Sequence, residues 1–533
     1  MDSVIDVMTG IRCFLYQKLE GVHLVSWRGA LLLVTTFIIY QILHTVVKAI
    51  YNIYFHPLRN IPGPKLWIAL PLLKDLQMMG GHLSFKVSAA HEKYGDVVRL
   101  GPDQVGFTCP EAWRDIYGHG HVELPKFFPK GSGMNDGNIV YSNVSNHFRI
   151  RKAMQPAFSD KALRQQEPLI RVYVSLLMER LREVADKGES TNMIRWYNFT
   201  TFDLIADLAY GEELHGLAEG KSNMWIDNVD KLMKLMPILV LVSTSPLLAK
   251  VLQFVAGPKI RKSQAKHREA SELMARKRIN RKEQADRGDF MDYMLRSRGE
   301  KHEMTDAELV SNCDLFMIAG SETTASLLSG VTYWLLNTPR SLKRVTEEVR
   351  SIFRRDEDID FKEASAKLPY MLACLDEALR MFPPIPISLN RMTLPGAPTP
   401  IAGLMIPENV RLTYLSIPSL SLHTPLTSSR PKSASTNSPP STPSATSTAL
   451  KNSSQSVGSP KAQMTLHLRS ITIDERSISR LVSDPEIVLA GIWRIMRCGL
   501  LWPDCCGILI WHWMNKVRIG MNRRFLRSGR GRL

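Results

Sequence analysis

The residues best suited to chemistry stand in one stretch, Ala319-Gly-Ser-Glu-Thr-Thr324, at the centre of an apolar segment. Gly320 is unfavourable inside a helix, Thr323 can hold a water molecule, and Glu322 is an ionisable group among apolar neighbours. A carboxyl group and a hydroxyl group at adjacent positions could relay protons to a buried reaction centre. Function is expected where local rules of helix composition are broken, so these residues are candidate catalytic groups. A core helix with a small-residue packing notch is the alternative.

A long buried helix must position this motif. Apolar residues recur at steps of three and four between Leu309 and Leu335, with few charges between them. This pattern predicts a helix from roughly Asp306 to Leu336 that is buried over most of its length. We expect the helix to bend at Gly320, where the backbone can open beside the reaction centre.

A second motif follows in the segment Leu372-Ala-Cys-Leu-Asp-Glu-Ala-Leu-Arg-Met-Phe-Pro-Pro384. The segment predicts a helix that the two prolines end, with Glu377 and Arg380 on one face. Taken alone, Glu-x-x-Arg is a common pattern and is usually a solvated ion pair. Its position downstream of the acidic and hydroxyl-bearing motif is what makes it informative.

The two motifs in this order resemble those of the cytochrome P450 family of heme-thiolate monooxygenases. Further matching parts are Ile61-Pro-Gly-Pro64 and the segment from His147 to Arg151, which leads into Gln155-Pro-Ala-Phe-Ser159. The resemblance covers roughly residues 50 to 413. It implies a mainly α, cytochrome P450 fold that is helix-rich with small β-sheets.

The resemblance also implies roles for the residues of the long helix. Thr323 would stabilise the bound oxygen, Glu322 would help to deliver protons, and Gly320 would open the helix beside them. The implied cofactor is heme b, whose cysteine thiolate ligand favours cleavage of the O–O bond after two electrons arrive from a reductase. The implied partner is NADPH-cytochrome P450 reductase.

On the heme side, the resemblance implies that His147, Arg151 and Arg391 bind the heme propionates. Glu377 and Arg380 would fix the scaffold as a largely buried ion pair, and we expect the loss of either partner to cost about 3–5 kcal/mol. Without the resemblance, a solvated basic face would explain His147 and Arg151, which stand four residues apart on one side of a helix.

The positive charge of the chain is concentrated near its C-terminal end. The net charge is +17, and from Tyr414 onward there are 16 Lys and Arg against 5 Asp and Glu, a net charge of +11. The body of the chain therefore has an ordinary charge balance, and we predict no nucleic-acid partner. The 7 cysteines are odd in number and scattered, which fits a reducing compartment without a disulfide framework.

A run of mostly apolar residues from Gly29 to Val47 predicts one membrane-spanning helix, because aromatic residues lie near both ends. No cleavage site follows it, so we expect an uncleaved, single-pass anchor, with a buried soluble helix as the alternative. The resemblance implies the endoplasmic reticulum, with the body of the protein on the cytosolic side. Residues 1–60 are then anchor and linker, followed by a Pro-Gly-Pro hinge.

Other elements follow from local pattern. Two apolar runs around Gly-Pro-Asp predict a hairpin, and a Gly-, Pro- and Asn-rich stretch predicts a long loop over a pocket. The segment Met236–Lys250 is too broken by prolines to span a bilayer, so it either lies on the membrane surface or forms a packed helix-loop-helix. The predicted elements are a hairpin at 97–108, the loop at 123–143, helices beginning near Ser145 and at 160–187, 200–210 and 259–287, and a strand pair at 403–412.

The character of the chain changes after Thr413. Residues Ser416–Pro460 are more than half Ser, Thr and Pro, so they cannot build a core and should be disordered. The cytochrome P450-like domain, residues 61–413, should continue here into a Phe-x-x-Gly-x-Arg-x-Cys-x-Gly pattern that carries the axial cysteine, and this pattern is absent. The late cysteines Cys498, Cys505 and Cys506 lack the required neighbours, so we assign no metal ligand.

A shift of reading frame accounts for the missing pattern. When Ser483–Arg494 is written in one permitted set of codons, reading from the third base gives Gly-Pro-Arg-Asn-Cys-Leu-Gly-Arg-Asn-Leu-Ala, with the cysteine codon across Ile487 and Val488. Ser454–Ser459 and Ser479–Ser483 reread in the same frame can give Pro-Glu-Arg-Trp-Leu and Pro-Phe-Ser-Val-Gly. We therefore expect residues 414–533 to be a frame-shifted translation.

Three hypotheses of function remain. The first is a membrane-bound cytochrome P450 monooxygenase, with a different true C-terminus, that oxidises an apolar small molecule, a secondary metabolite or lipid. The second is a catalytically inactive relative that lacks the heme-ligating cysteine. The third is a membrane-tethered binding or scaffold protein that uses its basic tail on acidic surfaces.

Overall fold

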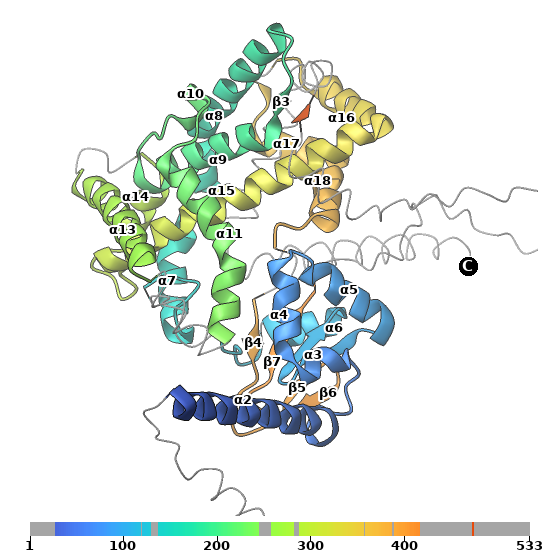
Figure 1. Ribbon diagram of the computed structural model, residues 1–533. Coiled ribbons are helices and arrows are strands. Elements are labelled where there is room, and N and C mark those ends of the chain that lie inside the picture. The colour runs from blue at the N-terminus through green and yellow to red at the C-terminus, as the bar shows by residue number, and fades with distance from the viewer. Residues whose placement is uncertain are drawn as a thin grey trace, which may run out of the picture.

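The computed structural model describes residues 27–118, 120–128, 137–244, 257–281, 287–355, 358–385, 389–415 and 472–473. Helices make up most of this structure and form a large lobe, while a smaller lobe contains the main sheet (Figure 1). The α-helices are α2 Trp27–Ile50, α3 Lys65–Ala69, α4 Pro71–Met79, α5 Leu83–Tyr94, α6 Pro110–Tyr117, α7 Val144–Met154, α8 Asp160–Asp186, α9 Met193–Tyr210, α10 Gly216–Glu219, α11 Met224–Thr244, α13 Gly257–Asn280, α14 Phe290–Leu295, α15 Asp306–Asn337, α16 Pro339–Ile352, α17 Phe361–Lys367 and α18 Pro369–Met381.

The strands form three small sheets. The largest has the order β1-β2-β7-β4, in which β2 and β7 are parallel and the other two neighbouring pairs are antiparallel. The strands are β1 Val97–Gly101, β2 Gln104–Phe107, β3 Thr191–Asn192, β4 Arg391–Met392, β5 Thr399–Ile401, β6 Leu404–Ile406, β7 Arg411–Tyr414 and β8 Thr472–Ile473. This architecture confirms the predicted fold class, which is mainly α with small β-sheets.

The hydrophobic core follows the two lobes. In the helical lobe, α9 and α15 pack along each other at the centre of a buried cluster that also draws on α7, α8, α14, α16 and α18. In the smaller lobe, Phe107, Trp113 and Tyr414 pack between the main sheet and α6, with the Trp113 and Tyr414 rings 5.0 Å apart. One large cluster thus fills the helical lobe, and two smaller clusters lie around the main sheet.

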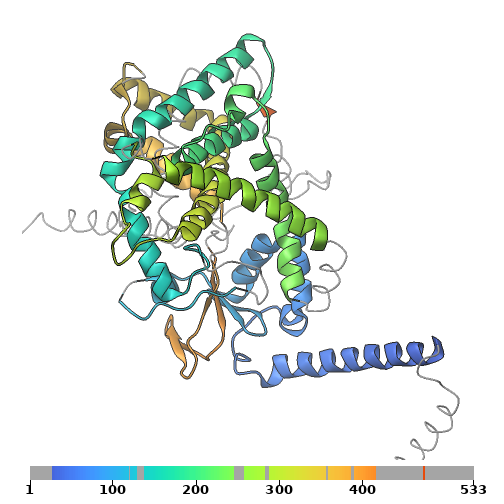
Figure 2. The same cartoon turned by 90° about the vertical axis from the view of Figure 1, so that its left-hand side faces the viewer.

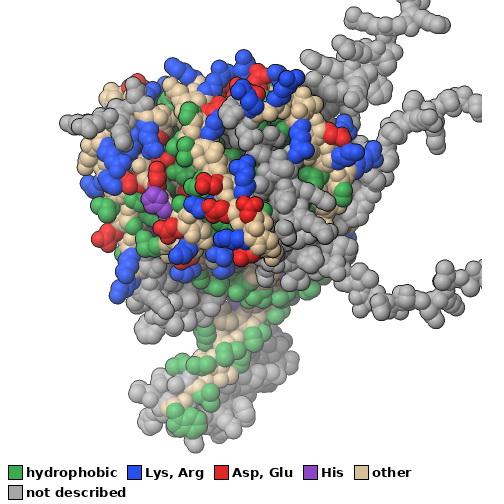
Figure 3. Space-filling view, turned by 90° about the horizontal axis from the view of Figure 1, so that it is seen from above, with side chains coloured by type: hydrophobic (Ala, Val, Ile, Leu, Met, Phe, Trp, Pro, Cys, Tyr) green, Lys and Arg blue, Asp and Glu red, His purple; other side chains and the backbone are tan. Residues whose placement is uncertain are grey.

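Helix α2 is exposed along its apolar face and projects beyond the body of the protein (Figure 2). The apolar segment Leu31–Phe55 is long enough to cross a bilayer, and it ends in a short π-helix, η1, Tyr51–Phe55. A long exposed apolar helix fits the predicted membrane anchor. Seen from above, the helical lobe carries Lys and Arg intermixed with Asp and Glu (Figure 3).

The Pro-Gly-Pro turn is clamped to the sheet, so the expected hinge is not free. The Arg99 amide donates to the Pro62 carbonyl at 2.8 Å, and a Cβ at Gly63 would meet the Arg99 carbonyl oxygen at 2.1 Å. The buried Arg99 guanidinium donates to the carbonyl oxygens of Asn52 at 2.8 Å and Pro102 at 2.7 Å. Glycine is required here because a strand backbone fills the space that a side chain would need.

Several predicted boundaries differ from the structure. The hairpin, the helix at 160–187 and the proline-ended helix are confirmed as β1–β2, α8 and α18, but α9 begins at Met193 because the Asn192 side chain caps it. Helix α11 continues to Thr244, and residues 245–250 lie outside the described residues. The surface role predicted for Met236–Lys250 stays a prediction, as does disorder in Ser416–Pro460, which also lies outside.

The predicted strand pair at 403–412 is wrong. Strand β6 pairs with β5, whereas β7 pairs with β2 and β4 in another sheet. Ala402 and Gly403 have φ angles of 49° and 76°, so they form a tight turn that folds β6 back on the preceding strand. Asn409, with φ of 59°, then turns the chain away before β7 begins.

A buried arginine ties α13 to α14 in the helical lobe. Arg278 is 1% exposed and donates through Nε and Nη2 to Asp289 at 3.1 and 2.9 Å, and through Nη2 to Asp292. Both carboxylates are also 1% exposed. Removing this cation would leave Asp292 without it and Asp289 with the Arg287 guanidinium at 4.0 Å, so two buried carboxylates would be poorly compensated.

We predict that Arg278→Met lowers the free energy of unfolding by about 3–5 kcal/mol. The matched control is Arg276→Met on the same helix, whose partner Glu272 is 44% exposed, and its cost should stay below about 1 kcal/mol. Denaturant titrations of the detergent-solubilised protein, followed by circular dichroism, measure both. Equal effects of the two substitutions would contradict the prediction.

Candidate functional site

The long helix that carries the central motif agrees closely with its prediction. Helix α15 runs from Asp306 to Asn337, and most of its side chains are buried. A capping box fixes its start, because the Thr305 side chain accepts from the Glu308 amide at 3.2 Å while the Glu308 carboxylate accepts from the Thr305 amide at 2.9 Å. The sequence Thr305-Asp-Ala-Glu308 is the local signal for this boundary.

The centre of α15 places its polar groups on two sides. Gly320, Ser321 and Thr324 are buried, whereas Glu322 and Thr323 are half-buried. The Thr323 hydroxyl donates to the Ala319 carbonyl at 2.6 Å, as expected for a threonine that bonds back one turn. That hydroxyl has given its proton to the helix, so toward its open side it can only accept a hydrogen bond. The helix is continuous through Gly320, and a bend there stays a prediction.

His147 and Arg391 meet around one carboxylate, although they are far apart in the sequence. Nη1 of Arg391, on β4, donates to Glu123 Oε1 at 3.0 Å and to the Leu124 carbonyl at 3.0 Å. Nδ1 of His147, on α7, lies 3.8 Å from Glu123 Oε2. The side chains of Arg391 and His147 are 3% and 2% exposed, and that of Glu123 is 22% exposed. We call the two basic side chains, Arg391 and His147, the Arg391–His147 pair.

Arg151 lies one turn after His147 on α7 and is half-buried. The same helix carries Arg149, which the sequence gave no reason to single out. Arg149 pairs with the Glu308 carboxylate and donates to the Glu303 carbonyl at 2.6 Å, so it fastens α7 to the start of α15. The sequence does not distinguish Arg149 from its basic neighbours, because three basic residues stand within five positions.

The Arg391–His147 pair suits the carboxylate edge of a heme. A buried guanidinium and an imidazole converge on an anion, and this donor set is chemically suited to a carboxylate ligand. An internal carboxylate, that of Glu123, already occupies the position where these two side chains meet. The described residues therefore fit the propionate side of the expected cofactor.

On the thiolate side of the expected cofactor, the described part of the chain offers no comparable fit. Its cysteines are Cys109, Cys313 and Cys374, and burial raises the pKa of all three thiols, that of Cys374 to about 11. The Cys313 thiol is turned to the Ala209 carbonyl at 3.4 Å. A thiol with a raised pKa is a poor iron ligand, because the ligand is the thiolate. None of the three stands in the family's Phe-x-x-Gly-x-Arg-x-Cys-x-Gly pattern, so none is assigned as the axial ligand.

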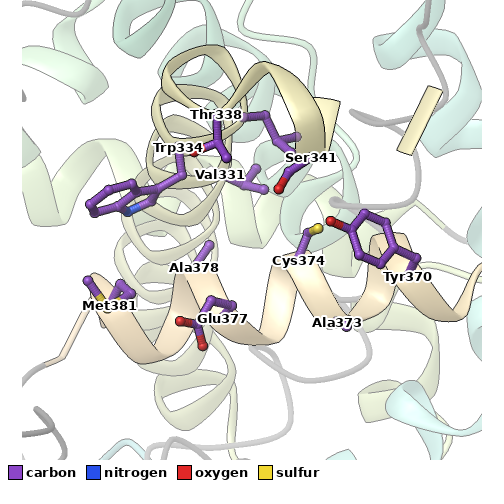
Figure 4. Close-up of a pocket in the computed structure, with 11 residues that line it drawn as sticks. Val331, Trp334, Thr338, Ser341, Tyr370, Ala373, Cys374, Glu377, Ala378 and Met381 are labelled. Carbon is purple, nitrogen blue, oxygen red and sulfur yellow. The ribbon is translucent and has the colours of Figure 1, made fainter. Parts of the chain in front are cut away.

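Glu377 and Arg380 form the predicted ion pair on α18, with Arg380 Nε 2.7 Å from Glu377 Oε2. The expectation that the pair is largely buried is wrong, because the side chains are 57% and 27% exposed. The carboxylate lies at the rim of a cleft of about 380 Å³ between the last turns of α15 and α18 (Figure 4). Trp334 on α15 and Cys374 on α18 also line this cleft. No described segment covers the pair.

Comparison with known proteins decides whether these motifs occur together by chance or by common descent. The family model described as cytochrome P450 matches residues 61–423. The chain belongs to the cytochrome P450 family. This membership confirms the resemblance on which the site residues were chosen, and it confirms the predicted monooxygenase-like function.

Curated cytochrome P450 relatives align with most of the chain. The cytochrome P450 monooxygenase dtxS2 of Metarhizium robertsii is 43% identical over 392 residues, which are 73% of this chain and 75% of that protein. The trichothecene C-4 hydroxylase of Trichoderma arundinaceum is 45% identical over 367 residues, or 69% and 73% of the two chains. The averantin hydroxylase of Dothistroma septosporum is 37% identical over 369 residues, 69% of each chain.

Family membership has two direct implications. Cytochrome P450 proteins carry a heme, and they take electrons from a redox partner. The exposed apolar helix α2 fits the N-terminal anchor of a membrane-associated member. The exact heme, the identity of the reductase and the cellular membrane are matters of proposal.

The exposure of Glu377 sets the expected cost of removing it. We predict that Glu377→Gln lowers the free energy of unfolding of this chain by less than about 1 kcal/mol, because an exposed ion pair is screened by water. The control is Glu348→Gln, since the Glu348 carboxylate accepts from the Tyr370 and Met371 amides at 2.9 and 2.8 Å at the start of α18. That change should cost about 1–3 kcal/mol in the same denaturant titration. A loss of several kcal/mol at Glu377 would contradict the prediction.

Proposed function

We propose that the gene encodes a membrane-bound monooxygenase of the endoplasmic reticulum that oxidises an apolar small molecule in secondary metabolism. The observation that carries the proposal is the cytochrome P450 match over residues 61–423. Its named relatives include two trichothecene hydroxylases and an averantin hydroxylase, which supports an apolar metabolite as the class of substrate. NADPH-cytochrome P450 reductase is the proposed electron donor.

Each site residue has a defined task in this proposal. Heme b, held by a cysteine thiolate, supplies the activation of O2. Arg391, His147 and Arg151 bind its carboxylates from the side of α7 and β4. Thr323 accepts a hydrogen bond from a water molecule on the open side of α15, and the adjacent Glu322 passes a proton to that water.

We propose that the residues after Leu415 are translated in a different reading frame from the one that encodes the cytochrome P450-like domain. Up to that point the chain packs as part of the sheet, because Tyr414 pairs with Phe107 and its hydroxyl donates to the Thr108 carbonyl at 3.1 Å. The Leu415 amide donates to the Phe107 carbonyl at 3.0 Å, and its side chain is 4% exposed. This packing supports a cytochrome P450-like domain that extends to Leu415, and we propose that the break lies between Leu415 and residue 423, where the family match ends.

Repair of the reading frame tests the proposal directly. Transcripts should carry a frame change between the codons for Leu415 and residue 423, and the repaired protein should give the reduced carbon monoxide band that names the family. The chain as printed should give no such band, because its late cysteines lack the Phe, Gly and Arg neighbours of the family's heme-binding pattern. An uninterrupted transcript that encodes the printed tail, together with heme-free protein, would favour the inactive relative instead. Salt-sensitive vesicle binding lost on deleting residues 451–533 would favour the scaffold protein.

The role of Thr323 has its own test in the frame-repaired protein. Thr323→Val keeps the shape of the side chain but removes the oxygen that accepts a hydrogen bond from water. We predict that product formed per O2 consumed falls roughly tenfold or more, while Thr323→Ser keeps most of it. Parallel measurement of oxygen uptake and product decides, and an unchanged ratio in the valine variant would remove Thr323 from proton delivery.

A further inference from the structure

Glu123 stands where an outside anion would bind. Its two carboxylate oxygens face two different partners, with Oε1 3.0 Å from Arg391 Nη1 and Oε2 3.8 Å from His147 Nδ1. Arg391 and His147 are nearly inaccessible to solvent, whereas Glu123 keeps 22% of its side chain exposed. The acid is therefore the outermost member of the group, and its side chain has a path to solvent.

The backbone next to Glu123 is fixed, which leaves its side chain as the part able to move. The Met392 amide donates to the Pro125 carbonyl at 2.8 Å, and the Phe127 amide donates to the Asn390 carbonyl at 2.9 Å. Lys126 then reaches the Ile139 carbonyl at 2.9 Å. Segment 125–127 thus runs along β4 as a short antiparallel edge, and it brings Glu123 back to the same position whenever its side chain is released.

A second carboxylate would compete with Glu123 for the same nitrogen of Arg391. Arg391 Nη1 already divides its protons between Glu123 Oε1 and the Leu124 carbonyl, so an incoming carboxylate that needs this nitrogen must displace the acid. If both anions stayed, two negative charges would lie side by side in a largely buried site, which is unfavourable. Exchange of one carboxylate for the other avoids that cost.

We propose that Glu123 is an internal placeholder for a porphyrin carboxylate: it occupies the Arg391–His147 pair in the empty protein and swings outward when the porphyrin binds. This inference rests on the proposed function, because it takes the ligand of the pair to be a heme propionate. It adds a residue that balances the charge of the buried Arg391 guanidinium before the cofactor arrives. The placeholder weakens porphyrin binding by the free energy of the contact it gives up.

The experiment uses the full chain and metal-free protoporphyrin IX, whose binding requires no axial cysteine. Quenching of tryptophan fluorescence gives the dissociation constant for the wild type, Glu123→Gln and Glu123→Asp. We expect Glu123→Gln to bind about three- to tenfold more tightly, because loss of one charge-assisted contact removes the competitor. Glu123→Asp keeps the charge but shortens the reach, so its gain should be smaller.

Two controls separate competition from general effects. Glu111→Gln removes an exposed acid from the neighbouring helix α6 and matches the change of net charge, so its affinity should equal that of the wild type. Protoporphyrin IX dimethyl ester has no free carboxylates, and its weaker binding should be the same in all four proteins. Thermal unfolding curves of each variant verify that it is folded.

The outcomes are distinct. Equal or weaker binding of protoporphyrin IX by Glu123→Gln would overturn the inference, since Glu123 would then support the site instead of occupying it. Binding by none of the folded proteins would overturn it as well, because the pair would not be a site for a porphyrin carboxylate. Failure of the proposed function shows differently, as a frame-repaired protein without the carbon monoxide band while the printed chain still binds the metal-free porphyrin.

Discussion

A buried guanidinium requires a carboxylate partner. Much of this structure is arranged around the guanidinium of Arg391. The side chain is 3% exposed, and its partner Glu123 lies 268 residues earlier in the sequence. An unpaired charge at such a depth would cost several kcal/mol, so the two segments must fold together. Neighbouring bonds extend the connection from β4 through segment 125–127 to the turn at Ile139, whose amide donates to Asn312 on α15 at 3.0 Å. The central helix is tied to the smaller lobe in this way.

Local pattern predicted the elements of the site better than their contacts. Helix α15 was predicted almost to the residue, because apolar periodicity is a property of neighbouring residues. The position of His147 on α7 was accessible for the same reason. Glu123 carried no signal, because it lies in a loop and gains its meaning from partners on α7 and β4. The family resemblance supplied the cations of the site but not the carboxylate between them.

The Glu377–Arg380 pair illustrates why burial is harder to predict than pairing. Spacing along α18 places the two side chains together, and the structure has them in contact. Burial depends on what packs over the helix from elsewhere in the chain, and no described segment lies over Glu377. The cleft beside it has an explanation in our proposal. The part of the chain that should cover α18 and supply the thiolate has been replaced by another reading of the same bases.

The position of β7 in the main sheet sets the order in which the protein can be assembled. This strand lies between β2 and β4, so β1 and β2 wait for residues that are synthesised some 300 positions later, as the pairing of Gln104 with Arg411 illustrates. The apolar helix α2 leaves the ribosome long before that. For most of translation, the β1–β2 hairpin therefore has an unpaired edge while the apolar helix is also exposed. Chaperones that bind exposed apolar and strand surfaces protect such a state from aggregation. In our proposal the frame changes after Leu415, once the residues of all four strands of this sheet have been translated.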